Sequence, residues 1–168
     1  EFWQFGAEVL GESDPSIDAQ LIYLSHRILS DLQIRDKCKL RINTMGSKDD
    51  RKQFYEAIAN FYSGKERSLT PTTQDKLKSK KYLEVLIPRS EDEEILLDMA
   101  PKITDFLSKS SQAFFDQVVE YTSSFDIEFE VDPTMTRGVP YHTNTIFEFI
   151  DTDTNQPILV GGRYDNLI

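Results

Sequence analysis

The residues best suited to chemistry lie between residues 136 and 149, where an arginine precedes a proline and two polar aromatic rings. Arg137 is permanently charged and offers five donors in a fixed fork, which suits a phosphate or a carboxylate. Tyr141 and His142 follow it and supply rings with polar tips, and a β-branched, aromatic strand comes next. The pattern predicts either an anion site at the mouth of a strand or a β-hairpin whose arginine is a surface charge.

The first ten residues alternate in a way that predicts a β-strand with two different faces. Gln4 and Glu8 fall on one face, about 13 Å apart at roughly 3.3 Å per residue. Gly6 lies between them and carries no side chain, which leaves a gap where a small ligand could rest on the sheet. A strand whose polar face meets water explains the same pattern, so both interpretations stand.

A glycine pair near the end of the chain is a third candidate. Gly161 and Gly162 follow the apolar run of residues 158–160, which is expected to be a strand. Paired glycines after a strand let a ligand approach the backbone closely, but they are also ordinary turn residues.

Size and composition are those of an ordinary globular domain. The 168 residues are 39% hydrophobic and 29% charged, which is enough for a buried core, and no apolar run reaches the length of a membrane span. The net charge of −10 argues against a chain whose main task is to grip a phosphate backbone. Two histidines and one cysteine make no convincing zinc site, so no metal site is expected, and Cys38 is interpreted as a buried structural thiol.

Local signals predict alternating strands and helices over the first 64 residues. Asp14 is expected to cap a helix with Pro15 at its first position, ahead of an apolar stripe at helical spacing. Residues 38–46 read as an alternating strand and its end, and Ser47 is expected to start the next helix.

The character of the sequence changes over residues 65–124, where charge density rises and short helical patterns are punctuated by prolines. Two apolar series in this range predict a small helical subdomain inserted between strands. Its acidic run, Glu91 to Glu94, is expected to be a solvated helix start, because acids there favour the macrodipole. Strand alternation returns over residues 125–131, and residues 151–157 are expected to form a hairpin loop.

Five blocks, taken together and in order, resemble one family. They are Gln4-Phe5-Gly6-Ala7-Glu8-Val9-Leu10-Gly11, Leu40-Arg41-Ile42-Asn43-Thr44-Met45-Gly46, Ala100-Pro101-Lys102-Ile103-Thr104-Asp105-Phe106-Leu107, the segment from Thr136 to Phe149, and Gly161-Gly162-Arg163-Tyr164-Asp165. The family is histidyl-tRNA synthetase, a class II aminoacyl-tRNA synthetase. The blocks look like its motif 2 closing strand, the strand into its insertion domain, a phrase inside that insertion, its R-G-L-D-Y-Y histidine-binding motif, and its G-G-R-Y-D.

The resemblance implies a role for each candidate residue. Gln4 and Glu8 would contact bound L-histidine, with Glu8 accepting a hydrogen bond from the imidazole. Arg137 would lie against the α-phosphate of ATP and stabilise the charge that develops as histidyl-adenylate forms. The rest of the amino-acid pocket would be lined by Tyr141, His142, Gly161 and Gly162.

The sequence departs from the family pattern at two places. Where the family has Asp-Tyr-Tyr, this chain has Pro140-Tyr141-His142, and Asn144 stands where an arginine is common. These departures favour a non-catalytic relative, such as the histidine-sensing regulatory subunit of ATP phosphoribosyltransferase. Arg137 and the helical insertion favour the enzyme, and a free-standing interaction module over residues 65–124 is a third interpretation.

The chain begins in mid-strand without a methionine, which indicates a piece of a longer protein. The resemblance implies that motif 1, the ATP-binding arginine of motif 2, the motif 3 arginine and the anticodon-binding domain lie outside it. This piece is therefore expected not to aminoacylate tRNA by itself. The parent would be a cytoplasmic homodimer that uses ATP with Mg²⁺ and binds the acceptor stem of tRNA(His) near the helical insertion.

The expected fold class is α+β, as part of a class II synthetase antiparallel sheet with flanking helices plus a small helical insertion subdomain. Residues 1–64 would form the first part of the catalytic core, as strand, helix, strand and helix. Residues 65–124 would form the insertion, and residues 125–168 the second part of the core.

Overall fold

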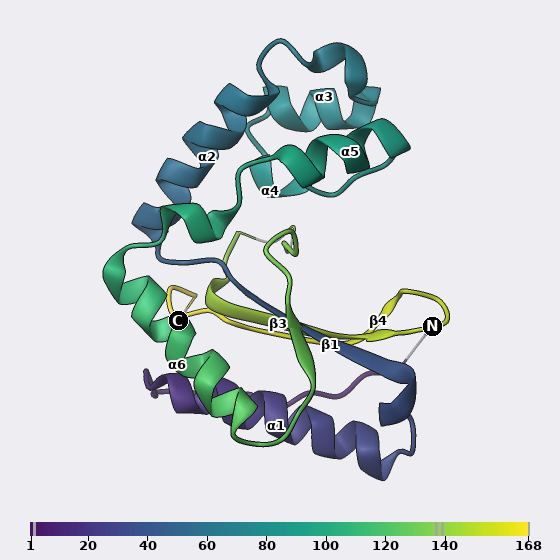
Figure 1. The fold of residues 1–168 in the computed structure, drawn as a ribbon, viewed down its shortest axis with the longest axis vertical. Helices are drawn as coiled ribbons and strands as arrows, with labels where there is room; N and C mark the ends of the chain where they lie inside the picture. The colour runs from purple at the N-terminus through teal and green to yellow at the C-terminus, as the bar shows by residue number, and fades with distance from the viewer. Residues whose placement is uncertain (2, 137, 139, 168) are drawn as a thin grey trace.

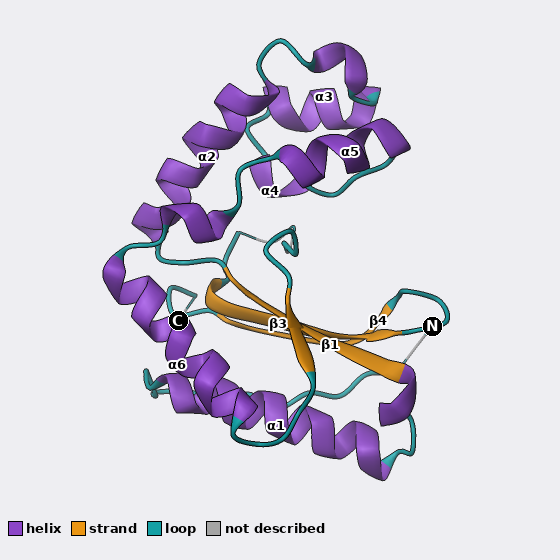
Figure 2. Ribbon diagram, viewed as in Figure 1, coloured by secondary structure: helices purple, strands orange, loops and turns teal. Residues whose placement is uncertain are grey.

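A computed structural model describes residues 1, 3–136, 138 and 140–167. The predicted catalytic residue Arg137 lies outside the described residues. A sheet forms the middle of the molecule, with two long helices on one face and a helical subdomain over the other (Figure 1; Figure 2). This arrangement confirms the α+β class. Among the described residues, no helix is both long and apolar enough to cross a membrane.

Over the residues that the structure describes, the sheet has four strands in the order β2-β1-β3-β4. Their bounds are β1, Cys38–Thr44; β2, Phe129–Val131; β3, Thr143–Asp151; and β4, Pro157–Arg163. The central pairs β1–β3 and β3–β4 are antiparallel, and the edge strand β2 runs parallel to β1, so the sheet is mixed. The strand predicted over residues 125–131 is therefore confined to its last three residues.

Helices α1 (Pro15–Asp31) and α6 (Lys109–Ser123) cover one face of the sheet. The predicted cap of α1 is confirmed, because the Asp14 carboxylate accepts a hydrogen bond from the Ser16 N–H at 2.8 Å and Pro15 is the first helical residue. Apolar residues of both helices pack with the inward side chains of the sheet. The buried members include Ile22, Leu29, Leu40, Ile42, Phe115, Val118, Phe147 and Phe149.

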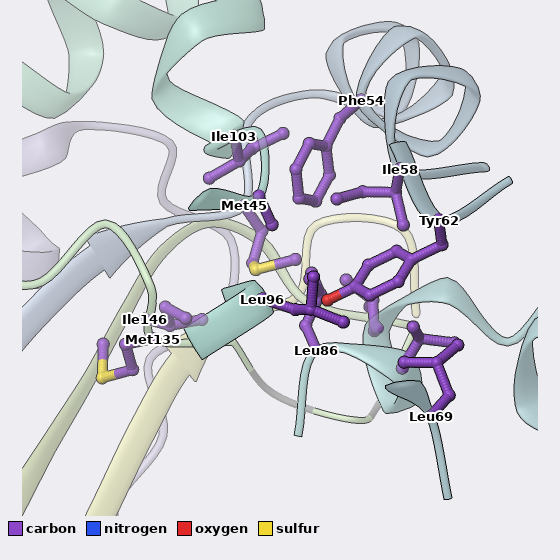
Figure 3. Packing of buried hydrophobic residues seen from close by; sticks show 13 residues of the cluster. Met45, Phe54, Ile58, Tyr62, Leu69, Leu86, Leu96, Ile103, Met135 and Ile146 are labelled. Carbon is purple, nitrogen blue, oxygen red and sulfur yellow. The ribbon is translucent and has the colours of Figure 1, made fainter. Parts of the chain in front are cut away.

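The remaining helices lie over the opposite face. They are α2 (Lys48–Tyr62), α3 (Pro71–Lys78), α4 (Tyr82–Val85) and α5 (Glu91–Met99), with short 3₁₀ turns at Glu66–Ser68 and Ile103–Phe106. A further 3₁₀ turn, Arg35–Lys37, joins α1 to β1. Ser47 caps α2 as predicted. Their buried cluster also contains Met45, Met135 and Ile146 from the sheet and its loops (Figure 3). By packing, α2 thus belongs with the helical subdomain and α6 with the core, while the domain boundaries at 64 and 124 stay predictions.

Residues 1–10 do not form the strand that their alternation predicts, and that prediction is wrong for the described residues 1 and 3–10. Trp3, on one expected face, is 97% exposed and Leu10, on the other, is 61% exposed, so neither face packs on the sheet there. Alternation records two faces of a chain, but a strand also needs neighbouring backbone groups to bond, and the sequence pattern does not say whether they are present.

The glycine pair also differs from expectation. Gly161 and Gly162 lie inside β4, which continues to Arg163, and each pairs with a residue of β3. Two residues without side chains are tolerated inside a strand where another group approaches closely. The apolar run 158–160 alone therefore underestimated the strand.

The acidic run at the start of α5 is not uniformly solvated, and that expectation is wrong for Glu93. Its side chain is buried, with 3% of the residue exposed. The carboxylate accepts hydrogen bonds from the backbone N–H groups of Thr70 and Arg89, both at 2.7 Å. Burial opposes ionisation, but the hydrogen bonds from the threonines and Arg89 outweigh it and lower the pKa of Glu93. Glu93 therefore holds the starts of α3 and α5 together.

We expect Glu93→Gln to destabilise the helical subdomain by about 2 kcal/mol at neutral pH, because the two backbone donors lose a charged acceptor. The folded-state pKa is lower than the ordinary value of 4.5. The ionised carboxylate therefore stabilises the fold fully above pH 4.5, and that benefit is lost as the pH falls through the folded-state pKa. Hydrogen exchange of α3 and α5 across this pH range measures the difference between wild type and variant.

Glu94→Gln is the matched control, since Glu94 is the next acid of the run and is exposed. An equal effect of the two substitutions, or a difference that grows on acidification, would contradict the role of Glu93.

Candidate functional site

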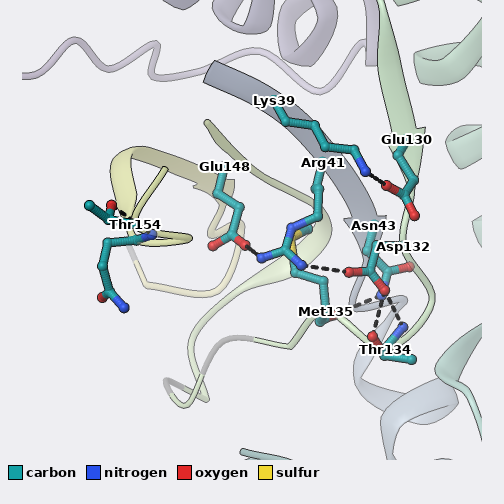
Figure 4. Close-up of polar contacts among 10 residues, drawn as sticks. Lys39, Arg41, Asn43, Glu130, Asp132, Thr134, Met135, Glu148 and Thr154 are labelled. Atoms are coloured by element: carbon teal, nitrogen blue, oxygen red, sulfur yellow. Dashed lines mark hydrogen bonds and ion pairs between the residues drawn. The ribbon is translucent and has the colours of Figure 1, made fainter. Parts of the chain in front are cut away.

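The face of the sheet toward the helical subdomain carries a polar network on β1 (Figure 4). The Arg41 guanidinium donates to Glu148 Oε1 at 2.6 Å and to Asp132 Oδ2 at 3.1 Å. The Asn43 side-chain amide donates to the Met135 carbonyl at 2.8 Å. Strand β1 thus fixes residues 132–135, which lead directly into the loop predicted to do chemistry.

His142 lies at the start of β3 and is 8% exposed. Its Nδ1 is 3.3 Å from the Arg163 carbonyl oxygen, and its ring centroid is 4.7 Å from that of Tyr141. A carbonyl can only accept, so in a neutral ring Nδ1 carries the proton and Nε2 is an acceptor. The Tyr141 ring, by contrast, is 43% exposed.

The two glycines of β4 face opposite sides of the sheet. A Cβ on Gly162 would come within 2.5 Å of His142 Cε1, so the histidine ring occupies the space that a side chain would fill. A Cβ on Gly161 would overlap the Phe147 ring, which belongs to the cluster under α1 and α6. Gly162 therefore lies beside the predicted pocket, whereas the geometry gives Gly161 a packing role on the other face.

The backbone is irregular just after His142. The pairing of β3 with β4 shifts register between Thr143 and Ile146, and Asn144 has a φ of +46°. The Asn144 N–H donates to the Gly46 carbonyl at 3.0 Å, and its carbonyl accepts from Met45. Asparagine tolerates positive φ better than most residues, which gives the unusual Asn144 a structural reason.

Glu8 and Tyr164 lie together at the same end of β4. Partial burial, then the hydrogen bond and negative charge of Glu8, raise the pKa of the Tyr164 hydroxyl. The hydroxyl therefore stays protonated and can donate to the Glu8 carboxylate. Tyr164 follows Arg163, whose carbonyl faces His142, so the contact places Glu8 at the same end of β4 as His142. Sequence reasoning did not select Tyr164, although it stands in the quoted Gly-Gly-Arg-Tyr-Asp block.

Arg163 joins this end of β4 to the rest of the core. Its guanidinium donates to Asp18 of α1 at 3.0 Å and to Asp165 at 2.6 Å, and also to the Glu12 carbonyl at 2.9 Å. Its side chain is 9% exposed and that of Asp18 is 8% exposed. Burial raises the pKa of Asp18 against the opposing effect of nearby hydrogen bonds and of Arg163. One arginine thus fixes the segment that follows Glu8 against both α1 and β4.

Helix α2 contacts the chain at His142, just before β3. Arg51, on its first turn, donates to the His142 carbonyl oxygen and is 7% exposed. An open groove of about 940 Å³ lies between this helix, Tyr82 and the segment at Tyr141. Its lining includes Lys48, Lys52, Tyr55, Tyr82, Tyr141 and Asn166.

The structure thus brings Glu8, Tyr164, His142 and Gly162 to one end of the β3–β4 pair. Gln4 is exposed in the irregular segment before Glu8. Within the described part of the chain, no group of three His, Cys, Asp or Glu side chains could hold a metal ion.

Comparison with known sequences identifies the family. The model of the family described as histidyl-tRNA synthetase matches residues 1–168, and the chain belongs to that family. It is 33% identical over 171 residues to the histidine–tRNA ligase of Psychrobacter arcticus and 34% identical over 170 residues to that of Streptococcus agalactiae. All of this chain is matched, but only 38% and 39% of those relatives, so it spans about two fifths of their length.

Solved structures agree with this assignment. Apo histidyl-tRNA synthetase of S. aureus superposes with a TM-score of 0.69 at 28% identity, over 93% of this chain and 38% of that one. A histidine–tRNA ligase subunit from Alicyclobacillus acidocaldarius superposes with a TM-score of 0.55 at 17% identity, over 92% of this chain and 54% of that one. The second match shows a shared fold alone.

Proposed function

We propose that this chain is part of the catalytic domain of an enzyme that activates L-histidine with ATP and transfers it to tRNA(His). The observation that carries the proposal is the convergence of Glu8, Tyr164, His142 and Gly162, from segments far apart in the sequence, at one end of two paired strands. Family membership supports it. The remaining machinery would lie in the part of the parent protein that this chain does not span.

In this proposal the Glu8 carboxylate accepts a hydrogen bond from the imidazole of the substrate. The Tyr164 hydroxyl donates to the same carboxylate and fixes its orientation. A fixed acceptor discriminates between substrates, because a substrate without the matching N–H leaves the acid unpaired. His142, with Nδ1 turned to the Arg163 carbonyl, would line the amino-acid pocket.

Arg137 remains the proposed partner of the α-phosphate, where a fixed cation would stabilise the charge that develops as histidyl-adenylate forms. We also propose the partners and setting implied by the family: the tRNA(His) acceptor stem near the helical subdomain, a homodimer, ATP supplied with Mg²⁺, and a cytoplasmic location. Residues 1–168 alone are proposed to be inactive.

The test measures histidine-dependent ATP–pyrophosphate exchange by the full-length parent protein. We expect Glu8→Gln to lower kcat/KM for histidine by about 10- to 150-fold, as for loss of one hydrogen bond to a charged group, while KM for ATP is unchanged. Glu12→Gln is the control, because only the backbone carbonyl of Glu12 is used by Arg163. A wild-type protein without exchange, or an unaltered Glu8 variant, would refute the proposal.

The second candidate function is a histidine-sensing regulatory subunit, which the Pro140-Tyr141-His142 departure favours. Calorimetric titration of the full-length protein separates the two. An enzyme binds histidine and ATP and releases pyrophosphate, whereas a sensor binds histidine without that release.

A further inference from the structure

The first turn of α2 is fastened to the core on two sides by consecutive residues. Asp50 accepts a hydrogen bond from the Ser108 N–H at 2.9 Å and another from the Ser111 hydroxyl at 2.5 Å, at the start of α6. Its neighbour Arg51 points to the start of β3 and donates to the His142 carbonyl. Both residues are buried, Asp50 at 2% and Arg51 at 7% exposure.

The segment that Arg51 holds is also tied to neighbouring parts of the core. Backbone hydrogen bonds join Met45 and Gly46 to Asn144, two residues beyond His142. Arg51 holds the residue just before the register shift of β3, and this backbone pair holds Asn144 within it, while the His142 side chain lies against Gly162. The guanidinium is a charged donor, and a hydrogen bond from a charged group to a buried carbonyl is stronger than a neutral one.

From this arrangement we propose that Arg51 is a positioning residue for His142. The packing of the helical subdomain on the core then sets the affinity for histidine. The inference rests on the proposed function, because it takes His142 to line the histidine pocket. In this role Arg51 acts through the backbone, because its guanidinium donates to the His142 carbonyl. Its effect should therefore appear in histidine binding and not in ATP binding.

The experiment compares Arg51→Ala and Arg51→Lys in the full-length parent protein by calorimetry with histidine or ATP and by pyrophosphate exchange. We expect Arg51→Ala to raise the Kd and KM for histidine by about 10- to 100-fold, the effect of losing one charged hydrogen bond. KM for ATP should stay within about twofold of wild type on the same basis, since no ATP contact is lost. Arg51→Lys should recover part of the histidine affinity, because it restores a cation without the planar fork.

Arg67→Ala is the matched control, since Arg67 is exposed on a 3₁₀ turn of the same subdomain and the same side chain is removed. If Arg51→Ala does not fold, Arg51→Lys carries the comparison. A purely structural role predicts a lower Tm and a lower active fraction with histidine KM unchanged, and that result would overturn the inference. So would parallel losses of histidine and ATP affinity.

The failure of the inference is distinguishable from failure of the proposed function. If the wild-type protein performs histidine-dependent exchange and Arg51→Ala leaves the histidine KM unchanged, only the inference is contradicted. A wild-type protein with no exchange sinks the proposed enzyme first, and histidine binding by calorimetry then still tests Arg51.

Discussion

Gly162→Ala is expected to lower kcat/KM for histidine in the full-length protein by about 10- to 100-fold, the effect of forcing a methyl group into a filled space. The new Cβ would come within 2.5 Å of His142 Cε1 and 3.2 Å of Ile146 Cγ2. Ile146 is fully buried, so the histidine ring is the group that must move. Histidine-dependent pyrophosphate exchange and calorimetry with histidine measure the result.

Gly161→Ala provides the matched comparison, because it adds the same methyl group to the neighbouring residue on the opposite face. Its Cβ would overlap the Phe147 ring in the core under α1 and α6. We expect a loss of about 1–3 kcal/mol of stability, as for overpacking, with histidine KM unchanged. If Gly161→Ala weakens histidine binding and Gly162→Ala does not, the assignment of the two glycines to the two faces is wrong.

Arg163→Ala is expected to cost about 3–5 kcal/mol in the free energy of unfolding, because it leaves a buried acid without its partner. Arg163 Nη1 lies 3.0 Å from Asp18 Oδ1, and both side chains are less than 10% exposed. The substitution also removes the hydrogen bond to the Glu12 carbonyl and the guanidinium over the Phe114 ring. Urea unfolding followed by circular dichroism measures the change.

Two controls separate the buried pair from an ordinary charge effect. Arg27→Ala removes an ion pair with Asp31 whose side chains are 57% and 75% exposed, and it should change stability by less than about 0.5 kcal/mol. In the double variant with Asp18→Leu and Arg163→Leu, no buried charge is left unpaired, and much of the loss should be recovered. A loss from Arg163→Ala no larger than that from Arg27→Ala would contradict the prediction.

The elements that follow from local chemistry could be predicted from the sequence. Asp14 with Pro15, and Ser47, mark helix starts because a short polar side chain satisfies backbone donors that any helix leaves open. The alternation of residues 38–44 identified β1, because one of its faces is buried under helices. The family resemblance, which rests on blocks spread along the chain, was confirmed by the comparisons.

The features that sequence reasoning missed depend on contacts between distant residues. Arg51 reaches His142 across 91 positions, and Arg163 reaches Asp18 across 145 positions. No local pattern distinguishes these arginines from surface cations, and Glu93 likewise resembled its solvated neighbours. The strand expected over residues 1–10 failed for the same reason, because alternation is local but strand pairing is not.

The helical subdomain and the sheet share one apolar interior, since Met45, Met135 and Ile146 pack in the same cluster as Phe54 and Ile58 of α2. The subdomain therefore cannot be exchanged independently of the sheet. A graft from a relative, joined near residues 47 and 108, would have to bring a surface complementary to those three core side chains. The solvent-facing residues of the subdomain can vary freely, whereas the residues that face the sheet can change only together with Met45, Met135 and Ile146.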